Sequence, residues 1–194
     1  MAKTPNKEIN LAQEAPKKGL FSKFFKKHSE KKTILSKIKD NNIKHFLFYT
    51  QVDNIYLILE NGIRLISQKN LKKDQEYTVW TYLENENSIG LEFDSSTRAS
   101  FWKWALEAGL SVEEVGVIGI NPEKLSELTT KDWSQDEDSN IVYVYENIPT
   151  KAIEWIMVKD RKNLDKIKTV VESNELDIAV YFGEKGNIKE VGKK

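Results

Sequence analysis

The stretch KHFLFYTQVDNIYLILENGIRLIS, residues 44–67, sets an amphipathic segment between two apolar ones. The apolar run at 46–49 has strand character. Apolar residues then recur at helical spacing over 55–59, and Asp53 or Asn54 could cap the start of that helix. Gly62 suits a left-handed helix end, and the residues after it alternate again. The stretch therefore predicts a compact strand–helix–strand unit, the second strand at 63–67.

The rest of the chain adds further strands and helices. Alternating or continuous apolar runs predict strands, and apolar residues spaced three or four apart predict helices. We read residues 131–140 as an acidic loop around Trp133. The mixture predicts an α+β domain. Strands are expected at 77–83, 88–93, 115–120, 141–145, 152–158 and 176–182, and helices at 101–106, 123–128 and 164–173.

Charge is balanced over the 194 residues but divided along them. Residues 1–45 hold 12 lysines and 4 acidic residues, and the remainder is acidic by the same margin. We expect a disordered tail at 1–18, a basic amphipathic helical arm at 19–42, a folded domain at 43–183 and a frayed C-terminus at 184–194. The arm could pack on the domain, lie on an anionic membrane or bind nucleic-acid phosphates. Its candidate phosphate-binding residues are Lys17, Lys18, Lys23, Lys26, Lys27, Lys31 and Lys32.

Composition excludes several classes of chemistry. The chain has no cysteine and only two histidines, His28 and His45, so thiolate nucleophiles, histidine triads and multi-histidine metal sites are not expected. No 18-residue apolar run predicts a membrane span. No apolar signal-peptide core precedes the domain, so the chain is expected to be cytoplasmic.

Five segments, in order, resemble the DarT family of toxins, which transfer ADP-ribose from NAD onto single-stranded DNA. The family's His-x-Thr strand, Asp-Asn turn and Ile-Leu-x-x-Gly helix end correspond to LFYTQVDNIYLILENGI. SIGLEF, VGVIGINPEKL, IVYVYENIPTKAIEWI and DIAVYF are similar to later segments of that family. The resemblance covers residues 43–183. It implies an ADP-ribosyltransferase-like fold, in which two small packed β-sheets frame a cleft and helices flank them.

The resemblance also implies NAD as substrate, single-stranded DNA or RNA as acceptor and a macrodomain-like antitoxin as partner. Binding NAD asks for aromatic walls, polar groups for the ribose and an arginine fork for the pyrophosphate. The cofactor-binding candidates are therefore Phe48, Tyr49, Thr50, Asn54, Arg64 and Arg98. We expected Thr50 and Arg64 to frame one slot.

The chain departs from the family at two positions. Phe48 stands where the family has histidine, and Ile141 stands where alignment on Ile148-Pro149 puts the catalytic glutamate. Glu146 and Glu92 are the catalytic candidates that could stand in, with Glu137 a further possibility. Three readings follow: an active ADP-ribosyltransferase, a fold relative that has lost catalysis and binds nucleic acid or protein, and an unrelated α+β interaction protein.

Overall fold

Seven strands and five α-helices make up the described part of the chain, which in this computed structural model comprises residues 29–65, 88–94, 100–107, 109–136, 138 and 140–192. Three short 3₁₀ turns join them. In chain order the elements are α1 (Glu30–Asp40), β1 (Phe46–Gln51), α2 (Val52–Asn61), β2 (Ile89–Phe93), α3 (Phe101–Glu107), η3 (Val112–Glu114), β3 (Val115–Ile120), α4 (Pro122–Leu128), β4 (Trp133–Asp136), β5 (Ile141–Val144), η4 (Thr150–Ala152), β6 (Ile153–Val158), α5 (Arg161–Ser173), β7 (Ala179–Phe182) and η5 (Ile188–Glu190).

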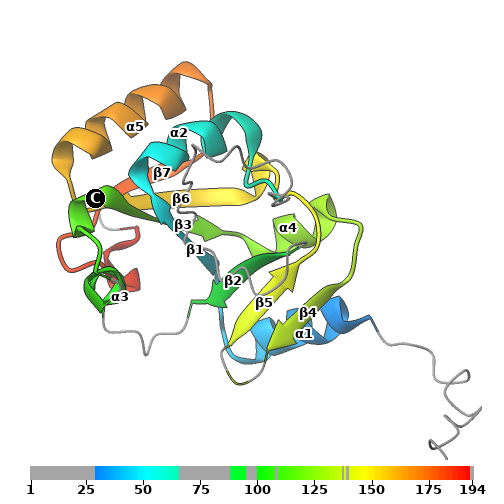
Figure 1. The fold of residues 1–194 in the computed structure, drawn as a ribbon. Coiled ribbons are helices and arrows are strands. Elements are labelled where there is room, and N and C mark those ends of the chain that lie inside the picture. Colours follow the sequence, from blue (N-terminus) through cyan, green and yellow to red (C-terminus); the bar gives the residue numbers. More distant parts are fainter. Residues whose placement is uncertain are drawn as a thin grey trace, which may run out of the picture.

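The strands form one mixed sheet in the order β4-β5-β2-β1-β3-β6-β7, antiparallel except for the β6–β7 pair (Figure 1). The predicted α+β class is confirmed. The two small sheets expected from the family resemblance are here two halves of one sheet. β1 pairs with β3 along its whole length, whereas it pairs with β2 only through Phe46↔Phe93 and Leu47↔Glu92. We call this short β1–β2 junction the seam.

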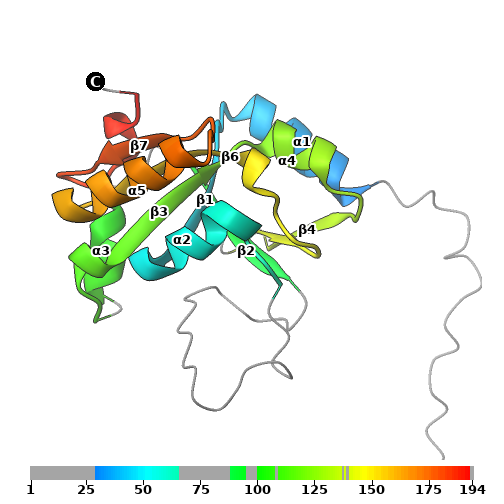
Figure 2. The same cartoon turned by 90° about the horizontal axis from the view of Figure 1, so that it is seen from above.

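Each face of the sheet carries its own hydrophobic cluster. The first cluster gathers under α2, α5, α1 and α4, and includes Phe48, Leu91 and Val142. The second gathers under α3 and η3 and includes Leu47 and Tyr49. Helices α2 and α5 lie side by side (Figure 1), while α3 and the α1–α4 pair lie at opposite ends of the sheet (Figure 2).

The unit at 44–67 forms largely as its sequence predicts, with two differences. Helix α2 begins at Val52, so Asp53 and Asn54 lie in its first turn and do not cap it. Gly62 ends the helix with φ of 73°, and a Cβ there would collide with the carbonyl oxygen of Ile148. Of the strand expected at 63–67, only 63–65 belong to the described residues, and they form one bridge, between Ile63 and Ile148.

Three other segments differ from expectation, and a fourth lies outside the described residues. Trp133–Asp136, expected to be a loop, pairs with β5 as strand β4. The last strand is shorter than predicted and begins at Ala179. The C-terminal segment expected to fray forms η5, closed by a capping box between Asn187 and Glu190. The strand expected at 77–83 lies outside the described residues.

Helix α1 is fastened to β4 by side chains. The Asp132 carboxylate accepts hydrogen bonds from the Ser29 hydroxyl at 2.8 Å and from the Lys31 backbone N–H at 2.9 Å. Glu30 Oε1 accepts from the backbone N–H of Gln135 at 3.0 Å, on the side of β4 that faces away from β5. The second half of the predicted arm is therefore part of the folded body.

Candidate functional site

At the turn from β1 into α2, two of the predicted site residues contact each other. Thr50 is the last fully buried residue of β1, and its hydroxyl accepts a hydrogen bond from the Asn54 side-chain amide at 3.2 Å. The chain changes from strand to helix at Gln51–Val52, and the first turn of α2 brings the Asn54 side chain back beside Thr50. The pair fixes a hydroxyl and an amide at the end of β1.

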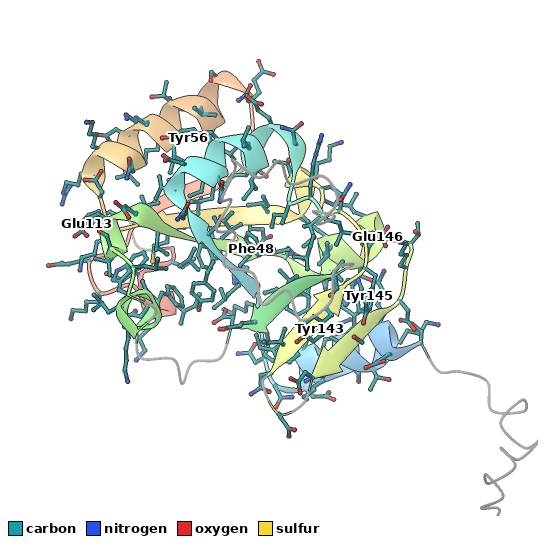
Figure 3. The ribbon with its side chains drawn as sticks, in the orientation of Figure 1. Phe48, Tyr56, Glu113, Tyr143, Tyr145 and Glu146 are labelled. Atoms are coloured by element: carbon teal, nitrogen blue, oxygen red, sulfur yellow. The ribbon has the colours of Figure 1, made fainter. Side chains whose placement is uncertain are left out.

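Strand alternation divides the predicted aromatic residues between the two faces of the sheet. Phe48 is 2% exposed and packs in the first cluster, whereas Tyr49 packs in the second, edge-on to Phe101 with ring centroids 6.2 Å apart. Successive strand residues point to opposite faces, so both cannot lie against one face of a ligand. Phe48 sits in the centre of the molecule in Figure 3.

Glu92 lies at the seam. It pairs with Leu47 of β1 on one side and with Ile141 of β5 on the other, and it is 9% exposed. Directly opposite residues in an antiparallel ladder point to the same face, with Cβ atoms about 5 Å apart. A carboxylate therefore stands one strand away from the position where the family resemblance places the catalytic glutamate.

A polar cluster that sequence reasoning missed adjoins Glu92 on the same face. His45 Nε2 lies 2.9 Å from Glu154 Oε2, and His45 Nδ1 lies 3.5 Å from Asp94 Oδ2. The Trp155 ring meets the imidazole edge-on at 5.6 Å. Asp94, Glu154 and His45 are far apart in sequence, and only the strand register brings them together. We call these three residues the His45 cluster.

The Glu154 carboxylate is held by several donors. Burial alone would raise its pKa, but hydrogen bonds from the Asn121 amide at 2.9 Å and from His45, with the charges of His45 and Lys124, lower the pKa below its usual value. Glu154 is thus stabilised as a carboxylate. Among the described residues, no three imidazole or carboxyl groups are arranged to hold a metal ion.

Glu146, the other catalytic candidate, is held in backbone contacts. Its carboxylate accepts hydrogen bonds from the backbone N–H groups of Thr130 at 2.7 Å and Lys131 at 2.6 Å, and from the Thr130 hydroxyl at 3.3 Å. It lies beside β5, away from Phe48 (Figure 3). These contacts fasten the loop after α4 to the end of β5.

Arg64 and Thr50 lie at opposite ends of α2. Thr50 precedes α2 and Arg64 follows it, so the ten-residue helix separates them by about 15 Å. Arg64 is exposed and donates to the Asn61 side chain at 2.9 Å. A depression of about 300 Å³ at the start of α2 includes neither of them and is lined by Gln51, Val52, Asp53, Glu114 and Asn163.

Only two of the seven candidate lysines lie in the described part of the chain, and they differ. The Lys31 ammonium donates to the carbonyls of Ser126 at 2.8 Å and Thr129 at 2.9 Å and lies over the Trp133 ring. Burial lowers its pKa, although Glu146 and Asp132 oppose that shift. Lys32 is exposed. Arg98, Glu137 and the lysines from Lys17 to Lys27 lie outside the described residues.

No protein-family model and no curated protein matches this chain. Solved structures do. Thermosipho africanus DarTG in complex with ADP-ribose aligns at a TM-score of 0.47 and 15% identity, over 71% of this chain and 49% of that one. Thermus sp. 2.9 DarT aligns over 94% of its own length, at a TM-score of 0.46 in both cases: with NAD⁺ at 10% identity over 71% of this chain, and with ADP-ribosylated ssDNA at 12% over 72%.

This chain spans about half the length of the Thermosipho protein. The helices of the described residues do not combine the length and apolarity needed to cross a bilayer. The structures that this chain is similar to are thus those of DarT and DarTG proteins, at identities of 10 to 15%.

Proposed function

We propose that this chain transfers ADP-ribose from NAD to an acceptor, with Glu92 as its catalytic carboxylate. The ordered resemblance of five segments to the DarT family motivates the reaction. The observation that carries the choice of residue is the β2–β5 ladder, in which Glu92 stands directly opposite Ile141. The carboxylate that Ile141 lacks is supplied by the neighbouring strand, on the same face.

NAD would bind where the two halves of the sheet part. β1 and β2 pair at Leu47↔Glu92 and no further, so the strands diverge from there towards Thr50. Thr50 follows Leu47 by three residues, about 10 Å along the strand. Glu92 lies at the closed end of this split, on the face of Leu47, and the Thr50–Asn54 pair lies towards its open end on the opposite face. NAD would therefore pass through the split, with its ribose at the Thr50 hydroxyl and the Asn54 amide.

The reaction needs little acid–base catalysis from the protein. The bond from the ribose C1′ to the nicotinamide nitrogen breaks, with its electrons leaving on nicotinamide. C1′ then bonds to an acceptor nitrogen or oxygen, whose proton passes to the carboxylate or to solvent. A carboxylate beside the ribose stabilises the positive charge that develops there. Glu92, largely buried, would act more strongly than an exposed carboxylate because the effective dielectric constant around it is lower.

The test is transfer of labelled ADP-ribose from NAD to single-stranded DNA, to RNA and to protein in cell extract. We expect Glu92→Gln to lower the rate by at least about 100-fold, in the range lost when a group stabilising transition-state charge is removed. The decisive variant is Glu92→Gln with Ile141→Glu, which returns a carboxylate to the same face one strand away. We expect it to recover part of the lost rate.

Glu146→Gln is the matched control, because it removes a strand-end carboxylate whose hydrogen bonds come from backbone and hydroxyl donors of the loop after α4. If Glu146→Gln abolishes transfer and Glu92→Gln does not, Glu146 is the catalytic residue. Absence of both NAD binding and label transfer in the unsubstituted protein would refute the proposed reaction.

A second function, binding without catalysis, is favoured by the same two departures from the family. Phe48 is packed inside the first cluster, and Ile141 is 5% exposed and apolar. A module of this kind would bind single-stranded DNA or RNA, or a macrodomain-like antitoxin, with no turnover of NAD. It predicts retention of nucleic-acid binding in Glu92→Gln and its loss when Lys32 and the lysines before Lys31 are neutralised.

A further inference from the structure

The seam is the weakest lateral connection of the sheet in backbone terms. Two residue pairs join β1 to β2, against six that join β1 to β3. One more backbone hydrogen bond continues the seam past the ladder, from the Asp94 N–H to the His45 carbonyl at 3.0 Å. The relative position of the two halves therefore depends on what their side chains add at this end.

The His45 side chain reaches both halves of the sheet. Its Nε2 lies 2.9 Å from the Glu154 carboxylate, in the half containing β1, β3, β6 and β7. Its Nδ1 lies 3.5 Å from the Asp94 carboxylate, which follows β2 in the other half. At 3.5 Å this second contact is not a hydrogen bond, and it is an ion pair only for a protonated imidazole. The side chains of His45 and Asp94 are 13% and 8% exposed, so water would screen that ion pair weakly.

The orientation of His45 is fixed from several sides. Glu154 is itself held by Asn121 at the start of α4 and lies 3.5 Å from the Lys124 ammonium. The Trp155 ring, lying over Gly119, meets the imidazole edge-on. Among the described residues, the charged groups around the imidazole are Asp94, which follows β2, Glu154 from β6 and Lys124 from α4, with Glu92 two positions before Asp94. His45 cannot turn away without breaking the Glu154 contact.

We propose that His45 is a positioning residue that clasps the two half-sheets together and thereby sets where Glu92 stands. Glu92 is two residues from Asp94 on the same strand, so any opening of the seam at Asp94 moves Glu92 relative to β1. This role for Glu92 rests on the proposed function. The clasp itself rests only on the contacts of His45.

Asp94→Asn is the key variant, because it removes the charge across the seam while keeping the side-chain shape and the His45–Glu154 contact. His45→Gln removes the imidazole, and Asp94→Glu restores the charge. The control is Glu123→Gln, which breaks the ion pair of Lys39 and Glu123. That pair is also 3.5 Å apart, but both of its side chains are exposed to water. All four are to be made in the full chain and checked for folding by circular dichroism.

The first readout needs no activity. The chain has no cysteine, so spin labels can be placed at Asp138→Cys in one half and Lys168→Cys in the other, both exposed. We expect a wider distance distribution in Asp94→Asn and His45→Gln than in the unsubstituted protein, and recovery in Asp94→Glu. The Asp94 amide, which donates to the His45 carbonyl across the seam, should exchange its hydrogen roughly tenfold faster when the seam opens more often.

The second readout is the split between kcat and KM. Because misplacement of a reacting group by about 1 Å can cost on the order of 100-fold in rate, Asp94→Asn should lower kcat by roughly 10- to 100-fold with little change in KM for NAD. Unchanged distance distributions and amide exchange in folded Asp94→Asn and His45→Gln would overturn the clasp. Failure of transfer in the unsubstituted protein would overturn the proposed function instead, and the spin-label result would still decide the clasp.

Discussion

The two edges of strand β1 are built differently. On the β3 edge, six residue pairs continue from Phe46 to Gln51, and hydrophobic clusters cover both faces. On the β2 edge, the ladder stops after two pairs, and polar side chains gather there: Glu92, Asp94 and His45 at the closed end, and Thr50 at the far end. The regularly paired edge holds β1 in place. The irregular edge carries the polar side chains that could contact a ligand.

The largest expected effect comes from the core beneath the seam. Phe46 is fully buried and packs against Phe93 at 5.8 Å and Trp133 at 5.7 Å between ring centroids, so it joins β1 to both β2 and β4. We expect Phe46→Ala to lower the free energy of unfolding by about 3–5 kcal/mol. Leu57→Ala, at a half-exposed position on α2, should change it by less than about 0.5 kcal/mol. Urea unfolding measures the free energy of unfolding of both variants. Equal losses would mean that Phe46 does not join the two halves of the sheet.

The β3 edge offers a sharper pair of substitutions. A Cβ at Gly119 would collide with the rigid indole of Trp155. A Cβ at Gly116 would crowd the terminal methyl of Ile55 at 2.5 Å and would lie at ordinary contact distance from Val158. A methyl group can move aside and an indole packed against Phe101 cannot. We therefore expect Gly119→Ala to cost about 1–3 kcal/mol and Gly116→Ala distinctly less. The reverse order in thermal unfolding would show that Trp155 is loosely held.

The half of the sheet beyond the seam depends on Lys31. Its ammonium group satisfies the carbonyls of Ser126 and Thr129, and we expect Lys31→Met to cost about 1–2 kcal/mol by leaving them without that donor. Lys32→Met should leave stability unchanged, because Lys32 is exposed. Nucleic-acid binding by filter retention separates the roles further: loss of binding in Lys32→Met alone would assign Lys32, and not Lys31, to the phosphates.

The smallest effect is a change in acid stability at the seam. Because the pKa of Glu154 is lower in the folded chain than in the unfolded one, its contribution is present above the unfolded pKa and is lost as pH falls through the folded pKa. Stability should therefore fall with acidification below about pH 4.5, and Glu154→Gln should make that fall shallower. Parallel pH profiles of the two proteins would contradict this.

The elements that the sequence predicted well are those with a strong local pattern. The helix after Thr50 and the strands at Val115–Ile120 and Ile153–Val158 carry continuous or periodic apolar residues, and they appear within a few positions of the expected bounds. β4 was missed because Trp-Ser-Gln-Asp has one apolar residue, and its strand conformation comes from pairing with β5. In the described part of the second strand expected for the opening unit, residues 63–65, Ile63 pairs only with Ile148.

The candidate site was harder to predict because it depends on register. Glu92 faces Ile141, and His45 meets Asp94 and Glu154, only once three non-adjacent segments have been aligned to the residue. Thr50 and Arg64 are close in sequence, but the ten residues of α2 lie between them and separate them in space. Sequence proximity predicted contacts within a turn, such as Thr50 with Asn54, and not across the sheet.

The outer edge of β4 has a consequence for how the chain behaves at high concentration. An open strand edge is a template on which another molecule can add its own strand, and proteins commonly block such edges. Here the Glu30 carboxylate occupies the backbone N–H of Gln135. A fragment that starts after Asp40 would lose this guard, and we expect it to self-associate and precipitate at concentrations where the full chain stays monodisperse.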